Sequence, residues 1–268
     1  MSFQPVVPLT GYVGWRFLER TLDTQQAAYA ESQPVKRVTD HFRENISKVT
    51  SAADLVNDRQ LLSVALGAFG LDDDINNGFF IRKVLEDGTL ADDALANRLS
   101  DSRYADFSRT FGFGDLPFPK TQTTRFADEI IARFEDQKFA KAVGTQNNDL
   151  RLAMNVSEGL SNILDGNSTN TGRWFSIMGT PPLREVFEKA LGLPRSVVSI
   201  DLDQQREIFQ ERAKSVLGTD QVDALSSPEA KESLIRLFLV RSEAAAFNTA
   251  NASSTALTLL RSSQLRPA

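Results

Sequence analysis

The chain of 268 residues has no cysteine and a single histidine, His41. Without cysteine, the protein can have no disulfide, thiol nucleophile, iron–sulfur cluster or cysteine-ligated zinc ion. With one histidine, it also has no pair of imidazoles for catalysis or metal binding. Because so few of the usual catalytic side chains remain, we expect a protein that is not an enzyme and that carries no cofactor.

Long hydrophobic runs are absent as well. No stretch approaches the roughly 18 to 20 consecutive apolar residues that span a bilayer. Residues 1–9 lack both the basic start and the long apolar stretch of a secretory signal peptide. We therefore expect no membrane insertion, and either a cytoplasmic location or export without a cleaved signal peptide.

Neither sign of charge dominates the sequence. The chain has 30 Lys and Arg residues and 35 Asp and Glu residues, which gives a formal net charge of -5. The basic residues are scattered singly, whereas nucleic-acid-binding proteins concentrate them on one surface. We expect other proteins as partners and no nucleic acid.

Two places in the sequence have a superficial likeness to a metal site. His41 and Glu44 are three residues apart and can share one face of a helix, but no second histidine exists to join them. The acidic run that begins at Asp72 resembles a calcium-binding loop, but Lys83 stands where the loop needs a bidentate glutamate. We therefore expect no metal site, and we expect the acidic run to cap the helix that contains Phe79.

Apolar residues recur at three- and four-residue spacing along nearly the whole chain, and no run alternates with the period of two that is typical of strands. This pattern predicts an all-α protein. Helix-capping residues and Gly or Pro stops give approximate bounds to the main helices. The expected helices are 34–46, 58–69, 73–87, 100–111, 124–143, 148–165, 180–191, 201–217 and 227–243. The polar run 167–172 is expected to be a surface loop.

A segment rich in Gly and Pro, residues 112–123, interrupts the helical pattern and predicts a connection between two helical lobes. The lobes are expected at 35–111 and 124–243. An N-terminal arm and first helix occupy 1–34, and a segment rich in Ala, Ser and Thr occupies 244–268.

The two lobes contain a faint internal repeat. Residues 58–71 align without gaps with residues 180–193, and both stretches end in Gly-Leu. The alignment favours two lobes related by duplication. The alternative is a chance likeness between two amphipathic helices.

Both ends of the chain have apolar residues that suit a contact with a partner protein. The N-terminal segment has several in a Pro- and Gly-containing context, and the C-terminal segment is small, polar and weakly amphipathic. The candidate partner contacts are Phe3, Tyr12, Trp15, Leu257, Leu260 and Arg261. The alternatives are an arm that packs on its own domain and a frayed terminal helix.

Several blocks of the sequence resemble an uncharacterised alphaproteobacterial family, a domain of unknown function whose genes tend to lie among flagellar genes. The similar blocks are residues 1–18, 58–71, 80–86, 99–104 and 190–194. The resemblance implies a non-enzymatic structural or assembly protein of the flagellum, with a role in motility through protein–protein contacts. It assigns no catalytic residue.

Residues 249–261 are also similar to the extreme C-terminus of flagellins, where an Ala-Asn step precedes a Leu-x-Leu-Leu-Arg ending. This second resemblance implies an exported component of the flagellum. Two other functions stay open. One is a cytoplasmic helical adaptor unrelated to flagella, and the other is a ligand-binding or enzymatic domain that uses carboxylates and Arg between the lobes.

Overall fold

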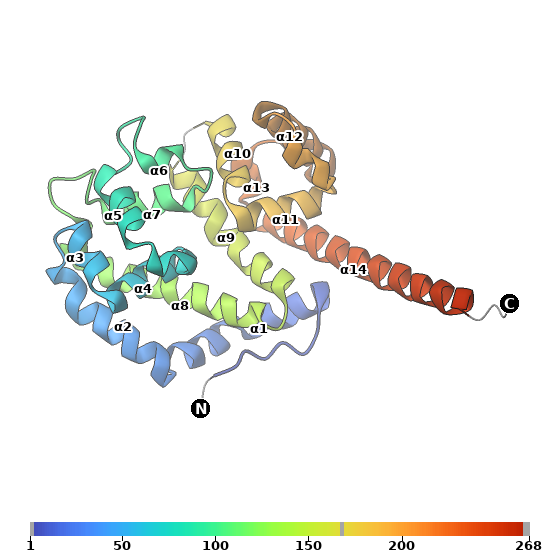
Figure 1. Ribbon diagram of the computed structural model, residues 1–268, viewed down its shortest axis with the longest axis horizontal. Coiled ribbons are helices and arrows are strands. Elements are labelled where there is room, and N and C mark those ends of the chain that lie inside the picture. Colours follow the sequence, from blue (N-terminus) through green and yellow to red (C-terminus); the bar gives the residue numbers. More distant parts are fainter. Residues whose placement is uncertain (1–2, 167–168, 265–268) are drawn as a thin grey trace.

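A computed structural model describes residues 3–166 and 169–264, with residues 249–264 as backbone only. In these ranges the chain forms fourteen α-helices and four short 3-10 helices, and no strand. The predicted all-α fold class is confirmed. Figure 1 shows two groups of helices side by side, with one helix that extends away from both.

The first lobe contains short helices around a core rich in phenylalanine. Its elements are α2 (Gln33–Asn45), η1 (Ile46–Lys48), α3 (Ala52–Asn57), α4 (Arg59–Ala68), η2 (Asp72–Asn76), α5 (Gly78–Asp87), α6 (Leu95–Arg98), α7 (Arg103–Phe111) and η3 (Lys120–Gln122). Phe42, Phe107 and Phe111 are fully buried in this core.

The second lobe contains longer helices around a separate core. Its elements are α9 (Asn148–Gly166), α10 (Asn170–Met178), α11 (Pro181–Leu191), η4 (Arg195–Ser199), α12 (Leu202–Leu217), α13 (Val222–Leu225) and the start of α14 (Pro228–Gln264). Trp174 lies at its centre, with edge-on contacts to the rings of Phe187 and Phe209.

Helix α8 (Phe126–Gly144) belongs to both cores. Its first turns bury Phe126 and Phe134 in the first core, whereas Phe139 and Val143 are buried in the second. Helix α1 (Gly11–Ala30) packs against α8, α9 and α14. The two cores therefore meet within α8.

The segment 112–123, which the sequence predicts as the connection between lobes, folds back onto the first lobe. The Asp115 carboxylate accepts hydrogen bonds from the backbone N–H groups of Thr89 at 2.6 Å and Leu90 at 3.2 Å. Two loops of the first lobe are held together in this way.

The predicted ends of the two repeat helices are confirmed. The Asp58 carboxylate caps α4 by accepting hydrogen bonds from the backbone N–H groups of Gln60 and Leu61. Helices α4 and α11 are each followed by a glycine with a φ of +66°, Gly70 and Gly192, which the left-handed region favours. The common origin of the lobes stays a prediction.

The start predicted for the helix over 73–87 is wrong. Residues 72–76 form the 3-10 helix η2, and α5 begins at Gly78 without a side-chain cap. The acidic side chains have other partners: Asp72 forms an ion pair with Lys138, and Asp74 accepts a hydrogen bond from the Tyr104 hydroxyl. Contacts from α7 and α8 therefore decide the conformation of this run.

Two further differences concern helices that are longer than the pattern suggests. Residues 170–172, expected in a loop, begin α10, because Thr169 caps the helix by accepting a hydrogen bond from the Gly172 N–H. Helix α14 does not end near Glu243 but continues to Gln264.

Candidate functional site

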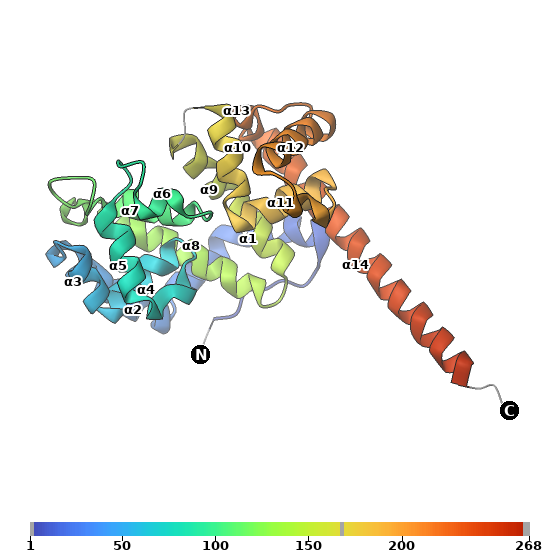
Figure 2. The ribbon, with the colours of Figure 1, turned by 45° about the horizontal axis from the view of Figure 1, so that its top comes forward.

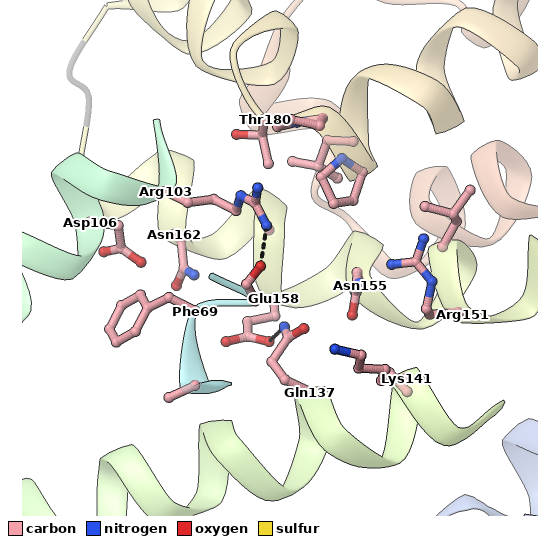
Figure 3. A pocket seen from close by; sticks show the side chains of 18 of the residues that line it. Phe69, Arg103, Asp106, Gln137, Lys141, Arg151, Asn155, Glu158, Asn162 and Thr180 are labelled. Carbon is pink, nitrogen blue, oxygen red and sulfur yellow. Dashed lines mark hydrogen bonds between the residues drawn. The ribbon is translucent and has the colours of Figure 1, made fainter. Parts of the chain in front are cut away.

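A polar cavity of about 420 Å³ lies between the two lobes (Figure 3). Its walls come from the end of α4, from η2, α7, α8 and α9, and from the start of α11. The polar and charged lining residues are Asp72, Asp73, Arg103, Asp106, Gln137, Lys141, Arg151, Asn155, Glu158, Asn162, Thr180 and Glu185. A volume of this size falls in the range of small-molecule sites.

Helix α9 contributes four polar side chains to the cavity: Arg151, Asn155, Glu158 and Asn162. They recur at intervals of four, three and four residues, and therefore share one face of the helix. The opposite face is buried in the core of the second lobe. Helix α9 thus separates a hydrophobic core from a polar cleft.

Two carboxyl groups of the cavity have perturbed pKa values: Figure 3 shows Asp106 at one side and Glu158 near the middle. Burial raises the pKa of Asp106, and the Arg133 guanidinium, 3.4 Å away, only partly offsets this effect. Burial also raises the pKa of Glu158, which accepts a hydrogen bond of 3.1 Å from the Gln137 amide. A cationic or hydrogen-bond-donating partner would stabilise the charged form of both carboxyl groups.

Basic side chains lie at the other end of the cavity. Figure 3 shows Lys141 and Arg151 together on the side away from Asp106. The Arg151 guanidinium donates to the Asn148 side-chain oxygen, and Lys141 Nζ is 3.4 Å from the Asp72 carboxylate. Of these two, Lys141 is paired with Asp72, whereas Arg151 has no carboxylate within 4.0 Å among the described residues.

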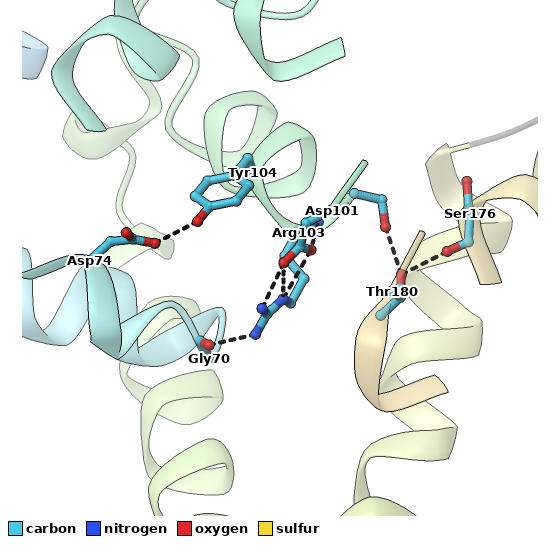
Figure 4. Close-up of polar contacts among 8 residues, drawn as sticks. Gly70, Asp74, Asp101, Arg103, Tyr104, Ser176 and Thr180 are labelled. Carbon is cyan, nitrogen blue, oxygen red and sulfur yellow. Dashed lines mark hydrogen bonds and ion pairs between the residues drawn. The ribbon is translucent and has the colours of Figure 1, made fainter. Parts of the chain in front are cut away.

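Arg103 lies above the middle of the cavity but is held by its own neighbours (Figure 4). Its guanidinium forms an ion pair with Asp101 at 2.7 Å and donates a hydrogen bond of 2.5 Å to the Gly70 carbonyl. These contacts connect the start of α7 to the end of α4, so Arg103 shapes the wall of the cavity.

A direct bridge between the lobes closes one side of the cavity. The Ser102 N–H donates to the Gly179 carbonyl at 2.9 Å, and the hydroxyl groups of Ser102 and Thr180 are 2.6 Å apart. A smaller cavity of about 290 Å³ adjoins the first and shares Arg103, Asp106 and Asn162 with it. The bridge fixes how α7 faces the start of α11.

His41 has contacts with residues other than Glu44. Its Nε2 atom is 3.1 Å from the carboxylate of Asp58, and its Nδ1 atom is 3.4 Å from the amide of Asn45. Among the residues that the structure describes, no three His, Asp or Glu side chains are grouped as ligands of a metal ion. Within 3–166 and 169–264, no helix is both long and apolar enough to cross a membrane.

The three N-terminal candidates for partner contact lie against the protein itself. Phe3 packs edge-on against Tyr29 at a centroid distance of 6.0 Å, and Trp15 is buried in the core of the second lobe. Tyr12 is half-buried, and its hydroxyl donates a hydrogen bond to Glu232 on α14. For these residues the arrangement is an arm and first helix that pack on their own domain.

The three C-terminal candidates, Leu257, Leu260 and Arg261, lie on α14, but their side chains are outside the described residues. Just before them, Phe247 is 68% exposed, and all residues from Glu243 to Asn248 are exposed. Figure 2 shows this end of α14 extending beyond both lobes.

Sequence reasoning missed the residues of the cleft. A polar stripe such as Arg151, Asn155 and Glu158 on an amphipathic helix is also the pattern of a solvent-facing surface. Only the position of the first lobe encloses this stripe. The sequence left open a site of carboxylates and Arg between the lobes, but no local signal pointed to these residues of α9.

A family model described as a protein of unknown function, DUF1217, matches residues 68–230. The chain belongs to the DUF1217 family. The DUF1217 match includes every residue that lines the cleft and ends within the first turn of α14. The expected membership in a family of unknown function is confirmed.

The fold is similar to a crystal structure, protein AGR_C_984 from Agrobacterium tumefaciens. The sequences are 25% identical, the TM-score is 0.73, and the match covers 90% of this chain and 98% of the other. A comparison with curated proteins gave no match.

Proposed function

We propose that the protein is a non-enzymatic structural or assembly protein of the flagellum and acts through protein–protein contacts made by the end of α14. The observation that carries this proposal is the exposure of residues 244–248 on a helix whose backbone extends beyond both lobes. At Glu243 the helix passes the start of α1, where its carboxylate accepts a hydrogen bond of 3.3 Å from the Thr10 hydroxyl. From there the helix leaves the body of the protein (Figure 1).

The composition of this end supports a contact role. Residues 244–260 have no charged side chain and are mostly Ala, Ser, Thr and Asn. A helix that stays in water normally has charged residues, and a helix without tertiary contacts is only marginally stable. A partner that covers this end of α14 would supply the missing packing.

An uncharged helix of another protein is the partner that this surface fits best. Small side chains such as those of Ala244, Ala245 and Ala246 let two helices approach closely. Phe247 then provides a single large apolar group for a pocket on the partner.

Support for the flagellum comes from the two resemblances in the sequence. The blocks in residues 1–18 and 58–71 are similar to a family encoded among flagellar genes, and residues 249–261 are similar to the C-terminus of flagellins. The proposal includes two versions, a cytoplasmic assembly factor and an exported component.

The experiment is deletion of the gene and complementation with four forms of the protein. The full chain should restore swimming, and a chain that ends at Glu243 should not. Phe247→Asp should reduce swimming strongly. Phe79→Asp is the matched control, because Phe79 is 87% exposed but lies on α5 in the first lobe.

Detection with an antibody against the body of the protein separates the two versions. Protein in filament or basal-body fractions supports an exported component, and protein confined to the cytoplasm supports an assembly factor. Normal swimming of the deletion strain would overturn the flagellar role. Partners captured through α14 only from outside the flagellar system would support the cytoplasmic adaptor instead.

A further inference from the structure

The cleft between the lobes is independent of α14 beyond Glu243, and three of its polar side chains have few partners within the described part of the protein. The side-chain amides of Asn155 and Asn162 make no hydrogen bond to any side chain or backbone group in the described part of the chain, although both line the cavity. Glu158, which lies between them on α9, has no ion pair within 4.0 Å among the described residues and accepts one hydrogen bond, from Gln137. Three neighbouring polar groups on one helix face are therefore available to a ligand.

The spacing on α9 sets the length of that ligand. Arg151 and Glu158 are seven residues apart on one face, which corresponds to about 10 Å along the helix axis. An extended peptide covers about 3.3 to 3.6 Å per residue, so about three residues span this distance.

The chemistry of the lining matches the two ends of a free peptide. A guanidinium such as that of Arg151, with the nearby Lys141 ammonium, binds a carboxylate well. A carboxylate such as that of Glu158 binds an ammonium group, and the Asn155 amide between them can both donate to and accept from a peptide bond. Phe69, Pro182 and Leu183 supply apolar surface for side chains.

We infer that the cleft binds a short zwitterionic peptide of about three residues, with its ammonium group at Glu158 and its carboxylate at Arg151 and Lys141. Glu158 and Arg151, which both lack an ion pair among the described residues, give the direction of binding, and Figure 3 shows Arg151 on the side of Glu158 away from Asp106. Burial makes an unpaired Glu158 carboxylate unfavourable, so an ammonium group there is stabilised strongly.

The test uses two libraries of tripeptides with randomised side chains, one with free ends and one with acetylated and amidated ends. The full-length protein is mixed with each library, and peptides that stay with the protein through gel filtration are identified by mass spectrometry. Free-end peptides should be retained at least tenfold more than blocked peptides.

Variants then locate the binding. Glu158→Gln and Arg151→Met should each reduce retention of free-end peptides at least tenfold. Glu211→Gln, which removes one exposed charge on α12, should leave it unchanged. Circular dichroism and thermal unfolding establish that each variant is folded.

Failure to retain any peptide, or equal retention of free and blocked peptides, would overturn the inference. Retention that is unaffected by Glu158→Gln and Arg151→Met would also overturn it, because binding would then lie elsewhere. The chain that ends at Glu243 should bind peptides like the full chain. Peptide binding and the swimming experiment can therefore fail independently.

Discussion

The two halves of α14 have the same backbone conformation but different surroundings. In the first half, Leu234, Phe238 and Leu239 are buried, and the helix contacts α9 and α11. Beyond Glu243 the described side chains are exposed, including Phe247 at 68%. One continuous helix thus passes from a hydrophobic core into solvent (Figure 2).

This difference shows what stabilises a long helix. The first half is held by tertiary packing of an apolar face, whereas residues 244–248 are exposed and depend mainly on backbone hydrogen bonds and helix propensity. Substitutions in the first half should therefore lower the free energy of unfolding substantially, whereas substitutions in the second half should change it little.

The largest effect is expected from Phe238→Ala in the packed half. The ring is fully buried, and Lys189 Nζ lies 5.4 Å from its centroid. Removing a buried aromatic ring costs about 3 to 5 kcal/mol, because it combines lost burial with a cavity. Urea unfolding measures the change. A loss below about 1 kcal/mol would show that α14 is not part of the core.

A smaller effect is expected from Arg241→Met, near the end of the packed half. Arg241 Nη1 donates a hydrogen bond of 2.5 Å to the Ala190 carbonyl at the end of α11. Hydrogen bonds of charged groups contribute about 1.5 to 3 kcal/mol, which urea unfolding should report as lost. Arg236→Met is the control on the exposed side of the same helix, with an expected change within about 0.5 kcal/mol.

Helix α9 supports the first half of α14 and also lines the cleft. Burial raises the pKa of the Glu158 carboxyl above its usual 4.5, an effect only partly offset by Arg133 and Gln137. A carboxyl with a higher pKa in the folded state gains a proton on folding, so stability falls as pH rises from 4.5 through the folded pKa.

Glu158→Gln should therefore raise the free energy of unfolding at pH 7 and flatten its fall above pH 4.5. The measurement is urea unfolding at several pH values, with Glu211→Gln as the exposed control. A stability loss at pH 7 would mean that the Glu158 charge is already compensated within the protein.

The smallest effect is expected from Phe247→Ala in the projecting half. Because the ring is mostly exposed, the free energy of unfolding should change by no more than about 0.5 kcal/mol. Hydrogen-exchange rates should also differ between the two halves of the helix. The amides around Phe238 should be protected, and the amides of residues 245–248 should exchange rapidly. Protection of the latter in the isolated protein would indicate a second copy packed on this end.

Much of the fold could be predicted from local signals. Asp58 at the start of α4 and the glycines after α4 and α11 act through their immediate neighbours, so a sequence pattern suffices to place them. The run from Asp72 to Asn76 could not be predicted in this way, because Lys138 and Tyr104 hold it from other elements.

The sequence by itself determined that the protein is all-α, because the 3.6-residue periodicity and the caps are local properties. It also excluded disulfides and thiol chemistry, because folding cannot supply an absent cysteine. Tertiary structure alone decided which polar faces are enclosed. Arg151, Asn155 and Glu158 line a cleft only because α4, α7 and η2 lie opposite α9. Residues 244–248 are exposed because no other helix in the described part of the chain lies beside α14 at these positions.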